Sequence, residues 1–312
     1  MANEYAKCLK NLGVNISSVI SSKNSKTVDH LISSYDINHK FQDINDILVN
    51  QGIWDAAIIC CSAEYTFSYL EKLAITDKPI LAEKPISSNI TELEKIIHFK
   101  NIVVGFNRRF YKNISYLKSE LANKNIDLVK LCIPDLNISD ILTKHKYLPD
   151  SVYSNSIHIF DLLLYLFGDV SWQSSVISKT NKSICSLSLL GFNKANINFS
   201  LDFPFNYPDN FSITIYAEET SYVIKPIEIL RVFKGMDIQE PSGDIPHRIY
   251  KPRLKNLIVA ESNEKFKPGL HDQVESFIEF CKYKTFDYRL ATIYDAKCAL
   301  NSIINIENLI KQ

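Results

Sequence analysis

The sequence is poor in glycine, with eight glycines among 312 residues and none before Gly13. It contains no Gly-x-Ser-x-Gly, His-Glu-x-x-His or Walker-type phosphate-binding motif. These absences exclude the serine-hydrolase elbow, the zinc-protease helix and the P-loop nucleotidase. The seven histidines are not at metal-ligand spacing, so the sequence predicts no metal site.

The sequence also lacks net charge, long apolar runs and paired cysteines. Lys plus Arg equals Asp plus Glu at 35 each, so no overall field favours nucleic acid or anionic lipid. No run approaches the roughly 20 apolar residues of a membrane helix, and none resembles a signal peptide. The seven cysteines form no Cys-x-x-Cys pair, which favours reduced, buried thiols. We therefore expect a cytoplasmic protein with no membrane or nucleic-acid partner.

The first part of the chain alternates between helical and strand patterns. Apolar or small residues recur at three- and four-residue spacing over residues 2–12, which predicts a helix that ends at Gly13. The continuous apolar run 54–61 is typical of a strand covered on both faces. Further strands are expected at 78–85 and 101–107, with helices at 63–76 and 89–100 between them. Residues 1–122 therefore predict a Rossmann-type, doubly wound parallel sheet.

The pattern changes in residues 123–312. Strand-like runs follow one another over 172–233 without a long helix between them, which predicts a large, mostly antiparallel sheet. An apolar helix is expected at 154–168, a loop at 241–268, and two closing helices after it. We expect an α+β second domain, with the last helix packing back on the first domain.

Ligands of open α/β sheets bind beyond the carboxyl ends of the strands. Four such ends are rich in polar residues: "SSK" at 21–23, "CCSAEY" at 60–65, "EKP" at 83–85 and "FNRR" at 106–109. They form a set of candidate binding residues: Ser22, Lys23, Cys61, Ser62, Tyr65, Glu83, Lys84, Asn107 and Arg108.

Four motifs, in order, carry a resemblance that spans essentially the whole chain. They are "AEKPIS" at 82–87, "VGFNRRF" at 104–110, "NSIHIFDLLLYLFG" at 155–168 and "FKPGLHDQVESFIEF" at 266–280. The sequence resembles the Gfo/Idh/MocA family of NAD(P)-dependent sugar oxidoreductases. The resemblance implies hydride transfer between NAD(P) and a hydroxyl or keto carbon of a sugar or nucleotide-linked sugar. The Asn-Ser-x-His sequence is similar to a branch of the family found in surface-polysaccharide gene clusters.

The resemblance implies two catalytic residues, Lys84 and His158. Lys84 would hydrogen-bond the sugar hydroxyl, and its charge would favour the alkoxide-like oxygen that forms as hydride leaves. It precedes a proline whose peptide bond is cis in many relatives. Ser154 stands where the family has an Asp, so Lys84 and His158 would share the proton. Asn155 would bind a hydroxyl, and Asp161 would orient the helix or contact the substrate.

The resemblance also divides the candidate residues between cofactor and substrate. The nine residues at the strand ends would bind NAD or NADP, with a slight preference for NADP because Lys23 could pair with a 2′-phosphate. Arg109 would contact the substrate, although the sequence does not decide which of Arg108 and Arg109 is structural. His247 and Arg253 belong to a basic cluster suited to a phosphate or carboxylate; a solvated basic loop is the alternative.

In this family a strand and a Gly-x-Gly turn precede the helix that corresponds to residues 2–12. Neither occurs in the printed sequence, which leaves three interpretations open: a start upstream of Met1, a broken reading frame, or a shortened product that does not bind a dinucleotide. For the chain as written we expect weakened folding and little NAD(P)H binding. The alternative function is a catalytically silent sugar-binding or assembly subunit. A homo-oligomer through the C-terminal sheet is expected by resemblance.

Overall fold

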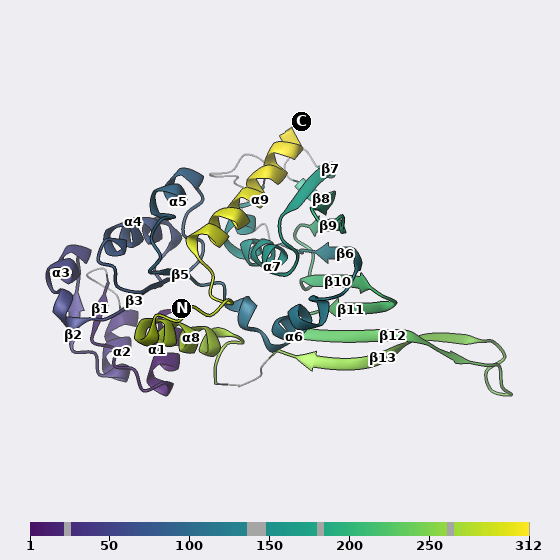
Figure 1. Cartoon of the computed structure of the whole chain (residues 1–312), viewed down its shortest axis with the longest axis horizontal. Helices are drawn as coiled ribbons and strands as arrows, with labels where there is room; N and C mark the ends of the chain where they lie inside the picture. Colours follow the sequence, from purple (N-terminus) through teal and green to yellow (C-terminus); the bar gives the residue numbers. More distant parts are fainter. Residues whose placement is uncertain (22–25, 136–147, 180–183, 261–264, 312) are drawn as a thin grey trace. The chain divides into compact units, whose positions relative to one another are not determined.

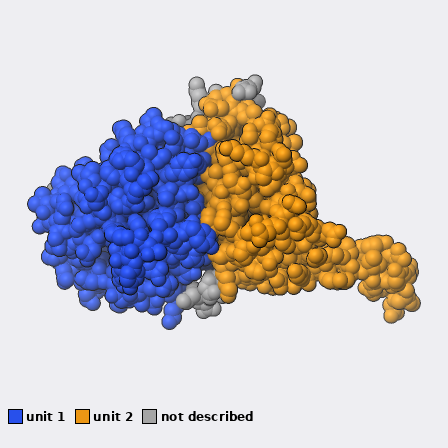
Figure 2. All heavy atoms as spheres, in the orientation of Figure 1, with its two compact units in different colours: residues 1–110, 262–301 blue, residues 111–261, 302–312 orange. Residues whose placement is uncertain are grey.

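A computed structural model describes residues 1–21, 26–135, 148–179, 184–260 and 265–311. The predicted cofactor residues Ser22 and Lys23 lie outside the described residues. The chain separates into two compact units (Figure 2): unit 1 is Met1–Phe110 with Ser262–Asn301, and unit 2 is Tyr111–Glu261 with Ser302–Gln312. The division at residue 122 stays a prediction; these units differ from it because 262–301 groups with the N-terminal part.

Unit 1 contains two short parallel sheets. One pairs β1 (Ser18–Ile20) with β2 (His39–Phe41), and the other has the order β3 (Ala57–Ile59), β4 (Ile80–Ala82), β5 (Ile102–Val104). The predicted parallel α/β architecture is confirmed. The helices of this part are α1 (Ala2–Asn11), α2 (Lys26–Tyr35), α3 (Ile44–Val49), α4 (Ala63–Ala74), α5 (Ile90–Ile96), α8 (Leu270–Tyr283) and the first turns of α9 (Ile293–Lys311) (Figure 1).

Helix α1 packs against elements of both sheets. Tyr5 and Cys8 share a core cluster with Leu81 of β4 and Val103 of β5. Ala6 belongs to a second cluster, against which Val19 of β1 packs. Among the described strands, β1 pairs only with β2 and β3 pairs only with β4. The two sheets therefore present facing strand edges, β1 and β3, beneath one helix.

Unit 2 is built on an eight-stranded sheet with the order β13-β12-β11-β10-β6-β9-β8-β7. Its neighbours are antiparallel except for β6 and β9, which confirms the predicted mostly antiparallel sheet. The strands are β6 (Ile126–Cys132), β7 (Val170–Lys179), β8 (Ile184–Asn193), β9 (Asn198–Pro204), β10 (Ser212–Ala217), β11 (Thr220–Ile224), β12 (Ile229–Gln239) and β13 (Ile249–Val259).

One face of this sheet is buried. Alternate residues such as Leu187, Leu189 and Leu201 are almost fully buried. Phe160 of α7 (Ile157–Phe167) stacks on Phe203 of β9, with ring centroids 6.3 Å apart. Helix α6 (Lys112–Leu121) completes the helices of this unit together with the end of α9. Among the described residues, no helix is long and apolar enough to cross a membrane.

The expectation of a loop over 241–268 was wrong. Strand β13 occupies Ile249–Val259 and forms a long hairpin with β12. The sequence of β13 does not indicate a strand, because charged residues and Pro252 interrupt any apolar run. An edge strand tolerates both, since one side of its backbone pairs with no neighbour.

Candidate functional site

Lys84 follows β4 directly, at the carboxyl edge of the parallel sheet. The backbone N–H of the preceding Glu83 donates to the carbonyl of Ile59 at 2.8 Å, which fixes the strand end. The Lys84–Pro85 peptide bond is cis, as the resemblance implied. Burial lowers the pKa of the Lys84 ammonium; Glu83 opposes this, and Arg108 and Lys267 add to it. A larger share of Lys84 is therefore neutral than of an exposed lysine.

Glu83 is held by a residue that sequence reasoning counted only as an apolar helix position. The Tyr5 hydroxyl of α1 donates to Glu83 Oε1 at 2.6 Å. Burial raises the pKa of Glu83, while the Tyr5 hydrogen bond and Lys84 oppose the increase. Burial, and then Glu83, raise the pKa of Tyr5 well above its usual value. The first turns of α1 thus lie against the edge that carries Lys84.

Cys61, Ser62 and Tyr65 lie at the carboxyl end of the neighbouring strand, β3. All three are exposed, and the Ser62 carbonyl accepts from Thr66 Oγ1 at 3.3 Å in the first turn of α4. Because β3 pairs with β4, these residues share an edge with Glu83 and Lys84. Strand β5 also pairs in parallel with β4, so residues 106–109 follow a strand end at the same edge. The structure therefore brings together three of the four strand ends selected from the sequence.

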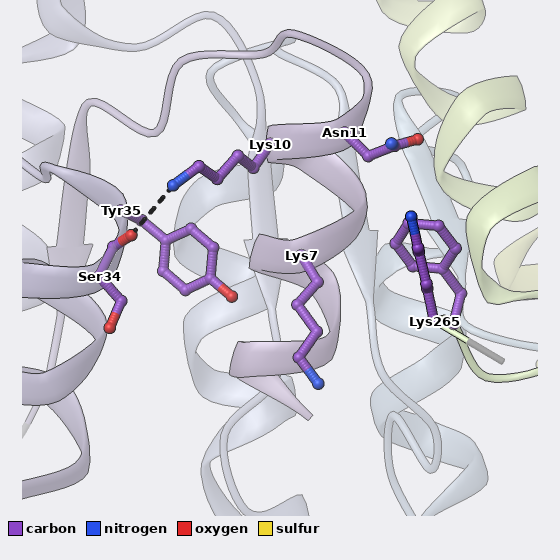
Figure 3. Close-up of a pocket in the computed structure, with 7 residues that line it drawn as sticks. Lys7, Lys10, Asn11, Ser34, Tyr35 and Lys265 are labelled. Carbon is purple, nitrogen blue, oxygen red and sulfur yellow. Dashed lines mark hydrogen bonds between the residues drawn. The ribbon is translucent and has the colours of Figure 1, made fainter.

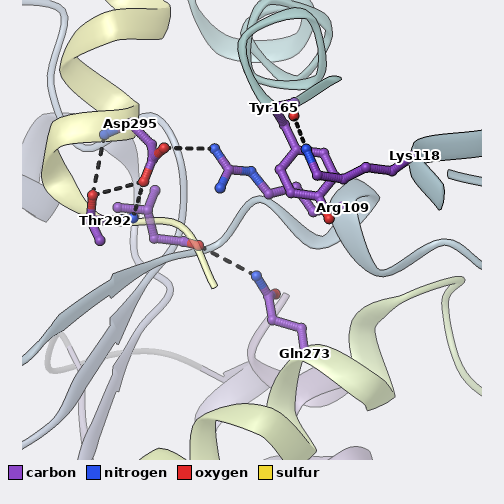
Figure 4. Close-up of polar contacts among 7 residues, drawn as sticks. Arg109, Lys118, Tyr165, Gln273, Thr292 and Asp295 are labelled. Carbon is purple, nitrogen blue, oxygen red and sulfur yellow. Dashed lines mark hydrogen bonds and ion pairs between the residues drawn. The ribbon is translucent and has the colours of Figure 1, made fainter. Parts of the chain in front are cut away.

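Two of the four motifs, at 104–110 and 266–280, are joined by hydrogen bonds in unit 1. Asn107 Nδ2 donates to the carbonyl of Pro268 at 3.0 Å. Gln273 Nε2 donates to the carbonyl of Val104 at 3.4 Å, as Figure 4 shows. These contacts position the loop before α8, including Lys267, near Lys84. The cofactor roles of Asn107 and Arg108 stay predictions.

Arg109 forms a buried ion pair that the sequence did not indicate. Its guanidinium Nη2 lies 3.0 Å from Asp295 Oδ1, and its side chain is 3% exposed. Asp295 Oδ2 also accepts from the Thr292 backbone N–H and hydroxyl, each at 2.7 Å (Figure 4). Burial alone would raise the pKa of Asp295, but Arg109 and Thr292 lower it overall. This environment is typical of a structural arginine, so of the two arginines Arg109 has the structural surroundings; its predicted substrate contact stays a prediction.

In unit 2 the predicted residues lie on a π-helical turn, Val152–Ser156, and on α7 directly after it. Asn155 is exposed, whereas His158 is 7% exposed and Asp161 is fully buried. The Ser156 hydroxyl donates to Asp135 Oδ2, and the Asp135 carbonyl accepts from the Asn206 N–H at 2.9 Å. The turn is thus anchored from within unit 2. Full burial suits Asp161 to the orienting role rather than to direct substrate contact.

His247 and Arg253 lie on the hairpin of β12 and β13. His247 is exposed, and Arg253 Nε donates to Asp237 Oδ1 at 2.6 Å. The neighbouring Arg248 pairs with Glu240 at 2.9 Å. The basic cluster is therefore partly neutralised by carboxylates of the same hairpin, and the substrate roles of His247 and Arg253 stay predictions.

A pocket of about 400 Å³ is lined in part by α1 and contains none of the predicted site residues. It is shown in Figure 3, and its lining residues are Lys7, Lys10, Asn11, Ser34, Tyr35, Lys265 and Phe266. Lys10 Nζ donates to the Ser34 carbonyl at 3.3 Å and thereby joins α1 to α2.

Replacing Arg109 by methionine is expected to lower the free energy of unfolding by about 3 kcal/mol, because it leaves the Asp295 carboxylate without its buried partner. Lys225→Met, which breaks the exposed pair with Asp209, is the matched control and should cost less than about 1 kcal/mol. Urea unfolding followed by circular dichroism measures both. Equal effects of the two variants would show that the Arg109 pair contributes no more than a surface pair.

Asp295 should also make stability depend on pH. Its folded pKa is lowered, so its contribution is fully present above the unfolded pKa of about 3.9 and is lost as pH falls through the lower folded value. Wild type and Asp295→Asn should therefore differ in unfolding free energy at neutral pH and converge in acid. A difference that stays constant down to strongly acidic pH would contradict this assignment.

Comparison with known families finds a match in the N-terminal part of the chain. Residues 2–102, from α1 to the start of β5, match the Gfo/Idh/MocA profile, described as an oxidoreductase family with an NAD-binding Rossmann fold. The match covers about a third of the chain and falls within unit 1. The match includes the edge that carries Glu83 and Lys84.

Relatives extend the likeness beyond this segment. YrbE, an uncharacterized oxidoreductase of Bacillus subtilis (strain 168), is 28% identical over 160 residues, covering 48% of this chain and 46% of YrbE. The chain thus aligns with about half the length of this curated relative. A dehydrogenase (MviM) from Clostridium difficile superposes with a TM-score of 0.74 at 18% identity, covering 98% of this chain and 95% of that one.

A UDP-N-acetylglucosamine 3-dehydrogenase, GnnA from Acidithiobacillus ferrooxidans, superposes with a TM-score of 0.71 at 14% identity. The superposition covers 98% of this chain and 92% of that one. At such identities these structures show that the fold is shared along nearly the whole chain.

Proposed function

We propose that the chain is an NAD(P)-dependent oxidoreductase that acts on a hydroxyl or keto group of a sugar or nucleotide-linked sugar. The observation that carries the proposal is Lys84: a half-buried lysine of lowered pKa at the carboxyl edge of a parallel sheet, in a segment that matches the Gfo/Idh/MocA profile. The UDP-sugar dehydrogenase among the structural neighbours supports the substrate class. The Asn155–His158 sequence supports a role in surface-polysaccharide biosynthesis.

The sheet edge that carries Lys84 suits the ribose and nicotinamide part of a dinucleotide. Exposed polar groups follow β3, and Lys84 follows β4, so the sheet edge offers hydrogen-bonding partners for a ribose and a nicotinamide carboxamide. A carboxylate has about four acceptor sites, so the Glu83 side chain that accepts from the Tyr5 hydroxyl keeps capacity for a ribose hydroxyl.

When bound, NAD(P)⁺ would accept the hydride from the carbon that carries the reacting hydroxyl. As that C–H bond breaks, the hydroxyl proton passes to the neutral amine of Lys84, and the hydroxyl oxygen becomes the carbonyl oxygen. The Lys84 ammonium returns the proton in the reverse direction, and the lowered pKa favours the neutral amine that accepts the proton during oxidation. His158 shares this proton work, and Asn155, exposed on the π-helical turn, binds a second hydroxyl.

The second candidate is a catalytically silent homologue that binds a sugar or assembles with other chains. In the described part of the chain β1 and β3 pair with no common strand, so the two sheets of unit 1 stay separate.

Absorbance assays with a set of cofactors and sugars, together with calorimetry, distinguish the two functions. The chain is mixed with NAD⁺ or NADP⁺ and with UDP-linked hexoses and N-acetylhexosamines, and the absorbance at 340 nm is recorded. An increase in the NAD(P)H absorbance with one substrate supports the oxidoreductase. Comparison of the rates with NAD⁺ and NADP⁺ tests the preference for NADP. Sugar binding by calorimetry without any absorbance change supports the silent homologue.

A further inference from the structure

The pocket of Figure 3 lies within unit 1 and is built from three segments that are distant in the sequence. Its lining residues come from α1, from the end of α2 and from the residues just before α8. Its volume of about 400 Å³ falls in the usual range of pockets that bind small molecules. The proton transfer proposed for Lys84 uses none of these residues, so the pocket has no role in that reaction.

Helix α1 forms the middle of this pocket. Lys7, Lys10 and Asn11 are three and four residues apart, so they share one face of the helix. None of the three is among the buried residues of α1, which pack into the core of unit 1. In Figure 3, Tyr35 lies on one side of α1 and Lys265 on the other. A molecule in the pocket would therefore lie along the lysine-bearing face of α1.

The pocket is positively charged. Three of its seven lining residues are lysines and none is acidic. Lys7 Nζ donates to Glu4 Oε1 at 3.1 Å, whereas Lys10 Nζ donates to the uncharged Ser34 carbonyl. Three lysines less the one carboxylate of Glu4 leave two positive charges. An ammonium has three N–H donors, so Lys7 and Lys10 keep donors beyond these bonds. The pocket therefore suits an anion with about two negative charges.

Two aromatic side chains line the same pocket, Tyr35 and Phe266. The Tyr35 hydroxyl donates to Asn3 Oδ1 at 3.1 Å, and the Phe266 ring lies 4.8 Å from the ring of His271. These contacts hold both rings in place without a ligand. An aromatic side chain fixed in this way offers a surface on which a flat ring stacks. The ligand that uses the whole lining is therefore an anion that carries a flat ring.

We propose that this pocket binds a phosphate monoester of a flat ring. A phosphate monoester carries about 1.5 to 2 negative charges at neutral pH, which matches the two positive charges of the pocket. Its ring packs against Tyr35 and Phe266. Such a ligand bridges α1, α2 and the segment before α8, so its binding stabilises unit 1 by mass action. This proposal depends neither on the proposed enzymatic function nor on dinucleotide binding.

Calorimetric titration with phenyl phosphate tests the proposal. The expected dissociation constant is below about 1 mM, and inorganic phosphate and phenol, which each lack one half of the ligand, should bind at least about 10-fold more weakly. Phenyl phosphate should also raise the midpoint of thermal unfolding. AMP is titrated in parallel. Tighter binding of AMP supports the proposal with a nucleobase as the ring, and weaker binding supports it with a smaller ring.

Two double variants of equal charge change locate the site. Lys7→Gln with Lys265→Gln removes two pocket charges and keeps the bond from Lys10 to Ser34. This variant should bind phenyl phosphate at least about 10-fold more weakly. Lys72→Gln with Lys100→Gln removes two exposed charges of unit 1 outside the pocket and should bind like the wild type. Circular dichroism establishes that both variants are folded.

Amide chemical shifts add a readout that does not depend on the variants. Phenyl phosphate should move the amide signals of Asn11 and Ser34, and should leave those of Cys61 and Ser62 at the sheet edge unchanged. The proposal would be overturned by a wild type that shows no saturable binding up to about 10 mM. Equal weakening in the two double variants, or shifts confined to the sheet edge, would also overturn it. Inorganic phosphate that binds as tightly as phenyl phosphate would contradict the role of the two rings.

Discussion

Replacing Lys84 by alanine is expected to lower the turnover number by about 10²–10⁴-fold, the usual contribution of a positioned proton-transfer group. The amine is held at a strand end by backbone pairing, and burial already favours its neutral form. Lys72→Ala is the matched control, because Lys72 is an exposed lysine of α4 away from the sheet edge. Initial rates at 340 nm give the effect, and circular dichroism shows that the fold is retained. Full activity of Lys84→Ala would remove Lys84 from the mechanism.

The pH profile distinguishes proton transfer from a merely structural role of Lys84. For oxidation, the rate should rise with pH through the pKa of Lys84, which lies below the usual lysine value of about 10.4. Lys84→Arg keeps the charge and the long side chain but cannot supply a neutral amine near neutral pH. The Lys84→Arg variant should lose this rise of the rate with pH. An unchanged rise would assign the pH dependence to another group, and His158 would be tested next.

Adding a central strand should join the two halves of unit 1. The designed addition is a strand of about five or six β-branched residues followed by a Gly-x-Gly turn, placed before Met1. Ser21 N–H donates to Phe41 and Ala57 N–H to Pro79, so by alternation the N–H groups of Ile20 and Ile58 point to the facing edges. Their amide exchange should slow markedly in the extended chain. The free energy of unfolding should rise by about 2 kcal/mol or more, because apolar burial exceeds the entropy of ordering the strand.

A Gly/Ser segment of equal length is the control for this addition. The Ile80 N–H, which already donates to Asn101 at 2.8 Å, serves as an internal reference in the exchange experiment. Equal exchange at Ile20 and Ile58 in the designed and control chains would show that the strand does not enter between β1 and β3.

Sequence patterns were sufficient for features that depend on local order. The fully buried β4 and β5 read as continuous apolar runs because both faces are covered. Lys84 and the exposed residues after β3 could be selected because strand ends are local features of the chain. The polar strand His39–Phe41 could not be predicted from the sequence, since two of its three residues are exposed and its position depends on pairing with β1.

Features that depend on distant partners were not predictable. Arg109 and Asp295 are 186 residues apart, and neither motif nor spacing connects them. Tyr5 reads as a core position of an amphipathic helix until its hydroxyl is found on Glu83. The β12–β13 hairpin is amphipathic only in its paired register, because a bulge between Phe233 and Met236 shifts which residues share a face.

Titration of NADH and NADPH into the chain with the added strand and Gly-x-Gly turn tests most directly whether unit 1 binds a dinucleotide. Saturable enhancement of nicotinamide fluorescence is expected in the micromolar to millimolar range, with affinity at least about 100-fold above that of the chain as written. Equal, tight binding by both chains would contradict the role given to the central strand. No binding by an extended chain that folds and protects Ile20 and Ile58 would contradict dinucleotide binding itself.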